Sequence, residues 1–193
     1  MLQSSGIFLA CGSRIVVGHA NPRTGAGMSL IENFVESRDN PLAVVESMAL
    51  RNDWSFERSV EDEIAIAVTG KRANYQVSFT WIGVMKVLHF SCSFEAKIPE
   101  SRLLETRQLV ARINEQLWIG HFDLWRRDGT VVFRHSLLLD GGVSTSGEQC
   151  EAVLGRALDA CEQYYPAFQF VIWAGKSARE AMDAAMFVTA GHA

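Results

Sequence analysis

The tripeptide Gly175-Lys176-Ser177 is the part of the sequence that most resembles a phosphate-binding loop. Such a loop needs another glycine five positions before the first, because its backbone amides must wrap around the phosphate groups. Phe170 stands at that position, and bulky residues follow it, so the motif fails. Ser177 and Glu180 instead form a capping-box pattern, which predicts that a new helix starts here. Gly175 is then the natural end of the preceding helix.

His121, Asp123 and Arg134 are the next candidates for chemistry. They lie in GHFDLWRRDGTVVFRHSLLL, where two strand-like runs flank Asp128-Gly129, a pair typical of a type I′ hairpin turn. With that turn, Asp123 lies directly opposite Arg134, and opposite charges there stabilise the ladder. The same count puts His121 on the face of Asp123, and His135 on the other face. Two ligands do not make a metal site, so we expect no metal and interpret Asp123 and Arg134 as a structural ion pair.

The same hairpin count pairs the apolar residues of the two strands on the other face. It places Phe122 beside His135, and Leu124 beside Phe133.

The cysteines form no redox or metal motif, because none belongs to a Cys-x-x-Cys pair. Cys92 shares the apolar face of an alternating strand, and Cys150 and Cys161 belong to one helical apolar stripe. We interpret these thiols as buried in a reducing compartment, where a free cysteine behaves as a small hydrophobic residue.

The composition is that of one globular domain. The chain has 193 residues, of which 48% are hydrophobic, enough for a real core. The net charge is −4 and the pI about 5.7, which argues against a general affinity for nucleic acid or an anionic membrane. No run of 18 apolar residues is present, so we predict no membrane span.

Periodicity along the chain predicts helices and antiparallel strands. Asn40-Pro41 is typical of a helix start, and a second helix begins after Pro99 and ends before Gly120. A further helix is expected over 146–165, interrupted by Pro166. Residues 166–174 fit a helix or a strand, and the stop at Gly175 favours a helix. Between the first two helices, four strand-like runs predict an antiparallel meander: 54–59, 63–70, 75–83 and 86–96.

The first 27 residues differ from the rest, with few charges and many Gly and Ser. We interpret 1–27 as a disordered extension and Met28 as the native start, with 28–193 as a single domain. Ser29 and Glu32 form a capping-box pattern for a short helix. The apolar residues of that segment are Leu30, Ile31, Phe34 and Val35.

Five tryptophans are many for one domain. Tryptophan is enriched at protein interfaces, although core packing is its commoner use. We take Trp81, Trp118 and Trp125 as the candidate interaction surface.

Three segments resemble the bacterial YbjN family in combination: NPLAVVESMALRNDWSFERSVEDEIAIAV, INEQLWIGHFDLWRRDGTVVFRHSLLL and ALDACEQYYPAF. The resemblance spans about residues 40 to 190. It implies an α+β fold similar to the type III secretion chaperones, an antiparallel β-sheet with helices packed on one face. Its recognisable segment contains Asn114 at a helix end, Gly120 at a strand entry, Phe122 in the core and Arg134 in an ion pair.

The resemblance also implies a function: a cytoplasmic, non-enzymatic regulatory or chaperone-like protein, acting as a homodimer that binds an unidentified protein. It supplies no catalytic residues and no cofactor. Two alternatives stay open. One is a small-ligand sensor, and the other is an enzyme with an unrecognised site around His121, Asp123 and Arg134.

Overall fold

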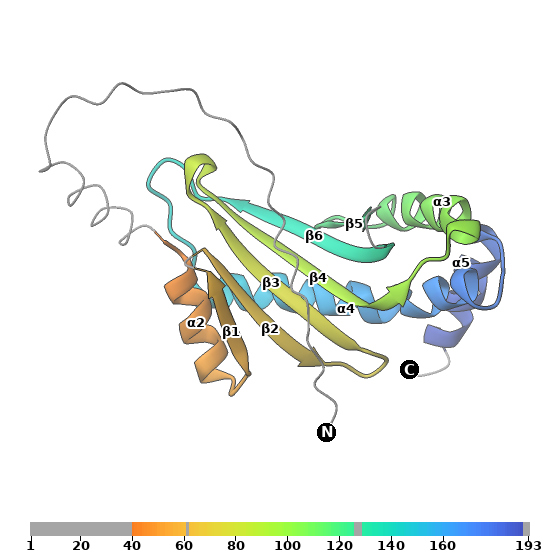
Figure 1. Cartoon of the computed structure of the whole chain (residues 1–193), viewed down its shortest axis with the longest axis horizontal. Helices are drawn as coiled ribbons and strands as arrows, with labels where there is room; N and C mark the ends of the chain where they lie inside the picture. Colours follow the sequence, from red (N-terminus) through yellow and green to blue (C-terminus); the bar gives the residue numbers. More distant parts are fainter. Residues whose placement is uncertain (1–39, 61, 126–128, 191–193) are drawn as a thin grey trace, which may run out of the picture.

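The structure is a computed structural model that describes residues 40–60, 62–125 and 129–190 (Figure 1). The extension expected at 1–27, the helix cap at Ser29 and Glu32, and Cys11 lie outside the described residues. So does Asp128 of the predicted hairpin turn.

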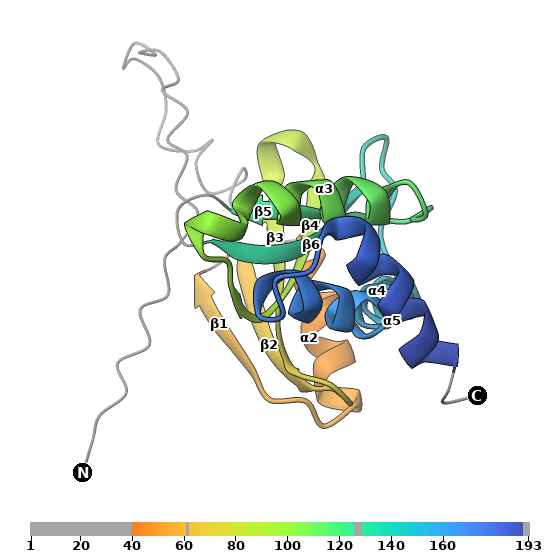
Figure 2. The ribbon, with the colours of Figure 1, turned by 90° about the vertical axis from the view of Figure 1, so that its right-hand side faces the viewer.

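One six-stranded antiparallel sheet forms the centre of the fold, with strand order β1-β2-β3-β4-β6-β5. The first four strands follow chain order, as the meander prediction requires. Helices α2 and α4 pack on one face, α5 packs against α4 and α3, and α3 lies beside β5 (Figure 2). This confirms the predicted α+β class. The strands are β1 (Phe56–Val60), β2 (Glu63–Thr69), β3 (Asn74–Ile82), β4 (Val87–Lys97), β5 (His121–Trp125) and β6 (Thr130–Leu138). The helices are α2 (Leu42–Arg51), α3 (Leu103–Asn114), α4 (Gly147–Ile172) and α5 (Ala178–Ala190), with short 3-10 turns at Gly83–Met85 and Glu100–Arg102.

A row of aromatic rings joins four strands to α4. Phe79 of β3 meets Phe90 of β4 edge-on at 5.0 Å between ring centres, and Phe90 meets Phe133 of β6 at 6.5 Å. Phe133 contacts Phe122 of β5 at 5.4 Å, and Phe122 contacts Phe168 of α4 at 5.4 Å. Such pairs contribute about 0.5–1.5 kcal/mol each beyond the area they bury. The row therefore fixes the sheet against its longest helix.

Helix α4 corrects the prediction at Pro166. The proline does not interrupt the helix but lies inside its 26 residues. A proline in a helix interior lacks the N–H for one backbone hydrogen bond and costs about 3 kcal/mol. The turn after Pro166 buries Ala167, Phe168 and Val171 completely, which offsets that cost. The preference for helix over strand at 166–174 is confirmed over the part that ends at Ile172.

The boundary between α4 and α5 is as predicted. Gly175 adopts a left-handed φ of +69°, and the N–H of Lys176 donates to the carbonyl of Phe170. The Ser177 hydroxyl accepts from the Glu180 N–H, and Glu180 accepts from the Ser177 N–H. Gly-Lys-Ser is thus a helix stop followed by a helix start, and the capping box is confirmed.

The register of the β5–β6 hairpin differs from the prediction by two residues. Trp125 pairs with Thr130, so residues 126–129 connect the strands instead of a two-residue turn. The longer connection lets Gly129 accept from the Ile98 N–H at 3.0 Å, just after β4. In this register Phe122 faces Phe133, not His135 as predicted. Packing of these two rings and the contact with β4 outweigh the local preference of Asp-Gly for a tight turn.

Because the shift is even, every side chain keeps its predicted face. Leu124 faces Val131 instead of Phe133, and Asp123 faces Val132 instead of Arg134. Asp123 nevertheless reaches Arg134 along the diagonal, and their Oδ2 and Nη1 atoms lie 2.9 Å apart. The predicted ion pair is confirmed, although its pairing geometry was wrong.

The turn between β2 and β3 is held onto α4 by one carboxylate. Glu162 Oε1 accepts from the N–H groups of Lys71 at 2.6 Å and Arg72 at 3.2 Å. A side chain at Gly70 would collide with both Glu162 and the Tyr75 ring, so only glycine lets the turn approach this closely.

Replacing Glu162 with alanine is expected to lower the free energy of unfolding by about 1–3 kcal/mol, because two backbone donors lose a charged acceptor. Chemical denaturation measures the change. Asp159→Ala, one turn earlier and largely exposed, is the matched control and should stay within about 0.5 kcal/mol of the parent. Equal losses for the two variants would contradict the role assigned to Glu162.

Candidate functional site

The face of the sheet opposite the packed helices carries mainly small polar side chains. His89 and Ser136 face each other across β4 and β6, with the His89 Nδ1 atom 3.0 Å from the Ser136 oxygen. On β3, Ser78 donates a hydrogen bond to Glu63 of β2. We call this surface the open face, because the described helices pack on the opposite side.

His121, Asp123 and Arg134 come together on the open face. His121 pairs with Arg134 across β5 and β6, and Asp123 lies two residues further along. The Asp123 carboxylate already has two partners, Arg134 and the Leu124 N–H at 2.8 Å. His135 lies on the core side, opposite Phe90 of β4, as its predicted face requires. The cluster is better suited to holding the hairpin together than to acid–base chemistry, which needs a free titratable group.

No group of three or more potential metal-binding side chains occurs in the described part of the chain.

Two histidines beside this cluster are held in the neutral form. Burial lowers the pKa of His89, and the nearby positive charge of Arg134 lowers it further, with smaller effects of His121 and His135. Burial also lowers the pKa of His135, followed by the effect of His121. Both rings therefore resist protonation in the folded protein more than in the unfolded chain.

The protein should lose stability as the pH falls below about 6.5, the ordinary pKa of histidine. There the unfolded chain takes up protons that folded His89 and His135 exclude, which favours unfolding. Thermal unfolding between pH 7.5 and 5.5 tests this. The double variant His89→Gln with His135→Gln should show a shallower fall than the parent protein. An unchanged fall would assign the pH dependence to other groups.

The three tryptophans do not form one surface. Trp81 is only 8% exposed and belongs to the core, so its place in the predicted interaction surface was wrong. It continues the alternation of β3 on the core side. Trp118 is fully exposed and Trp125 is 37% exposed, but they lie before the start and at the end of β5. Trp125 is the last residue of β5 and Trp118 lies three residues before its first, so the length of the strand separates them.

An apolar surface that the sequence reading missed lies at the β3–β4 turn. Register places Ile82, Val87 and Leu138 side by side across β3, β4 and β6 on the open face. Leu138 is 69% exposed, and Val84 and Met85 in the turn are 91% and 59% exposed. We call these five residues the hairpin patch. Alternation of β4 and β6 is the signal that could have found it, since both strands carry an apolar residue on their polar face here.

The outer edge of β5 is closed by side chains. The Phe122 N–H donates to Asn114 Oδ1 at 2.8 Å, and Asn114 Nδ2 donates to the Phe122 carbonyl at 3.0 Å. The Leu124 N–H donates to Asp123 Oδ1. Asn114 thus occupies the place of a neighbouring strand, a common protection of sheet edges. The roles expected for Asn114 at a helix end and Phe122 in the core are both observed.

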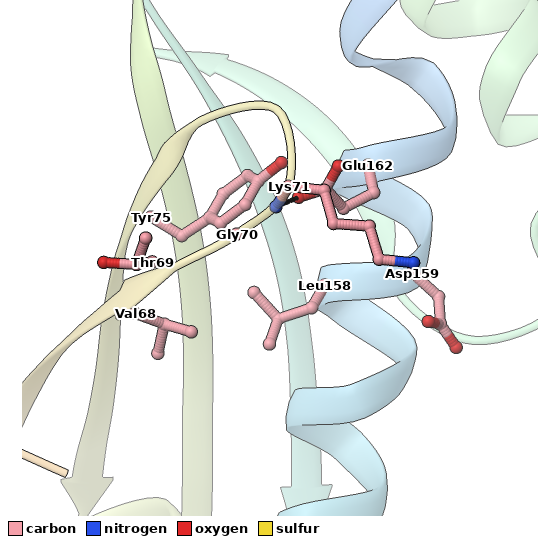
Figure 3. A pocket seen from close by; sticks show the side chains of 8 residues that line it. All are labelled: Val68, Thr69, Gly70, Lys71, Tyr75, Leu158, Asp159 and Glu162. Atoms are coloured by element: carbon pink, nitrogen blue, oxygen red, sulfur yellow. Dashed lines mark hydrogen bonds between the residues drawn. The ribbon is translucent and has the colours of Figure 1, made fainter.

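A cavity of about 450 Å³ lies between the β2–β3 turn and α4 (Figure 3). The Tyr75 hydroxyl is buried at its wall without a hydrogen-bond partner among the described residues. Burial raises the pKa of this hydroxyl well above its ordinary value, and the charge of Glu162 adds to the effect. The hydroxyl is therefore protonated at neutral pH. The lining residues are Val68, Thr69, Gly70, Lys71, Tyr75, Leu158, Asp159 and Glu162.

Three buried thiols are free. Cys92 and Cys161 lie with their sulfur atoms 3.9 Å apart between β4 and α4, and Cys150 is buried nearer the start of α4. Hydrogen bonding to Cys92 and burial raise the pKa of Cys161. All three lie in the core, as predicted, and a thiol without solvent contact is a poor nucleophile.

Comparison with known proteins identifies the family. The family model of YbjN, described as "Putative bacterial sensory transduction regulator", matches residues 41–170. No curated protein is similar to the chain by sequence. No described helix has the length and apolar character needed to cross a membrane.

Two solved structures align with this chain at low similarity. YbjN from E. coli aligns over 62% of this chain and 84% of its own, with 15% identity and a TM-score of 0.46. A chain of the ExsC–ExsE complex aligns over 74% of this chain and 96% of its own, with 16% identity and a TM-score of 0.43.

Proposed function

The chain belongs to the YbjN family, and from that premise we propose that it is a non-catalytic regulatory module that binds another polypeptide. It acts in the cytoplasm as a homodimer. The hairpin patch is the surface that receives the partner.

One observation carries this proposal: the five apolar residues of the hairpin patch adjoin one another, three of them exposed and Ile82 and Val87 half-buried. Its three strand residues are neighbours in register, and its two turn residues extend it beyond the sheet. Contiguous exposed apolar surface is unfavourable in water, and on soluble proteins it commonly marks a binding site. The polar rows of the open face next to it would form the rim of such an interface.

Other features of the chain support polypeptide binding over the two alternatives. An enzyme at His121, Asp123 and Arg134 would need a free carboxylate, whereas Asp123 is paired on both oxygens. A ligand sensor is favoured by the cavity and the unpartnered Tyr75 hydroxyl. The carboxylate of Glu162, which lines this cavity, already accepts hydrogen bonds from the backbone of the β2–β3 turn. A ligand would have to compete with that structural contact.

Replacing Val84 and Leu138 together with glutamate should abolish capture of a polypeptide partner, because two charges would be buried in the interface. Full-length protein is used as bait in its native lysate, and co-eluting proteins are quantified by mass spectrometry. The expected result is one stoichiometric partner with the parent chain and at least a tenfold loss with the double variant. Light scattering of the purified chain tests the homodimer separately.

Leu104→Glu is the matched control. Leu104 of α3 is 67% exposed, close to the value for Leu138, but it lies outside the hairpin patch. This variant should capture the partner like the parent chain. Equal capture by all three proteins would remove the hairpin patch from the proposal, and absence of any partner would favour the ligand-sensor alternative.

A further inference from the structure

We propose that the hairpin patch also binds the chain's own segment Leu30–Val35, so that this segment and the external partner compete for one surface. The inference rests on the proposed function for the role of the patch. It adds an internal ligand and thereby a means of regulation.

The described chain begins at Asn40, at the end of the sheet that carries the hairpin patch. Asn40 Nδ2 lies 3.5 Å from Asp62 Oδ1, and the Asp62 carbonyl accepts from the Trp81 N–H at 2.8 Å. Trp81 directly precedes Ile82, the first residue of the patch. The start of α2 and the β3–β4 turn accordingly lie at the same end of the sheet (Figure 1). Whatever precedes Asn40 therefore starts within a few residues' reach of the patch.

The connecting length is sufficient. Four residues lie between Val35 and Asn40, so the two are joined by five Cα–Cα steps, which span up to about 17 Å when extended. The strand part of the patch crosses three neighbouring strands, which lie about 4.8 Å apart. A segment that ends at Val35 can thus cover the patch without displacing Asn40 from Asp62.

The chemistry of the segment matches that of the patch. Its apolar residues have the spacing i, i+1, i+4 and i+5, which is typical of one helix face. Glu32 and Glu36 fall outside this set and would face water. Four apolar side chains would meet the five of the patch, and burial of both sets favours contact. Ordering the segment costs conformational entropy, which offsets part of this gain, so a partner that buries more apolar surface would displace the segment. The four apolar residues are Leu30, Ile31, Phe34 and Val35.

Photo-crosslinking from the patch tests the inference in the full-length chain. Val84 is replaced by p-benzoylphenylalanine, a change its 91% exposure tolerates, and the crosslinked peptides are identified by mass spectrometry. We expect crosslinks to residues 28–38 of the same chain. Mixing isotope-labelled with unlabelled protein distinguishes a crosslink within one chain from one between two copies. The same probe at Leu104 is the control and should give no crosslink to 28–38.

A second variant tests the chemistry of the contact. Phe34→Asp should lower the crosslink yield from position 84 at least fivefold, whereas Ser37→Asp should change it less than twofold. Crosslinks to a second copy, to another part of the chain, or equal yields for both variants would overturn the inference. In those cases partner capture through Val84 and Leu138 would still support the proposed function. A crosslink to 28–38 without patch-dependent capture would retain the internal contact and remove the proposed function.

Discussion

Packing of α4 across the sheet is the interaction on which the rest of the structure depends. The helix places Phe168 against the aromatic row of the strands, and it holds the β2–β3 turn through Glu162. It also carries the largest set of buried residues of any described helix. Strands β3, β4 and β6 therefore bury one face against the helix. This is why apolar and polar side chains alternate along them. The described helices that pack on the sheet lie on this buried side, and the opposite side carries the open face.

The sequence predicted those features whose cause is local. The side chains of Ser177 and Glu180 each accept a hydrogen bond from the other residue's backbone N–H. Their capping box can therefore be predicted from this short segment alone. Alternation in β3 and β4 reports a sheet with one buried face, and it placed Cys92 correctly. The ion pair of Asp123 and Arg134 was also found, because an error of two residues in register leaves both side chains on the same face.

Predictions failed where tertiary packing overrides a local rule. Asp-Gly favours a tight turn, but contacts of Phe122 with Phe133 and of Gly129 with Ile98 select a longer connection. Pro166 disfavours a helix interior, but the core contacts of Phe168 and its neighbours keep the helix continuous. Alternation along β4 and β6 places Val87 and Leu138 on the polar face, but only the register between three strands makes them neighbours of each other and of Ile82, so the hairpin patch was missed.

The open face combines two surfaces with different physical roles. In one of them Asp123 and Arg134 form an ion pair, and Asn114 hydrogen-bonds to the backbone at the outer edge of β5. Addition of a strand to β5 would have to break these hydrogen bonds. In the hairpin patch, by contrast, Val84 and Leu138 are exposed to water, and the described residues do not bury them. A partner would therefore gain free energy by burying side chains at the hairpin patch and not by backbone pairing at β5. This favours a partner that presents an apolar face over one that presents an extended strand.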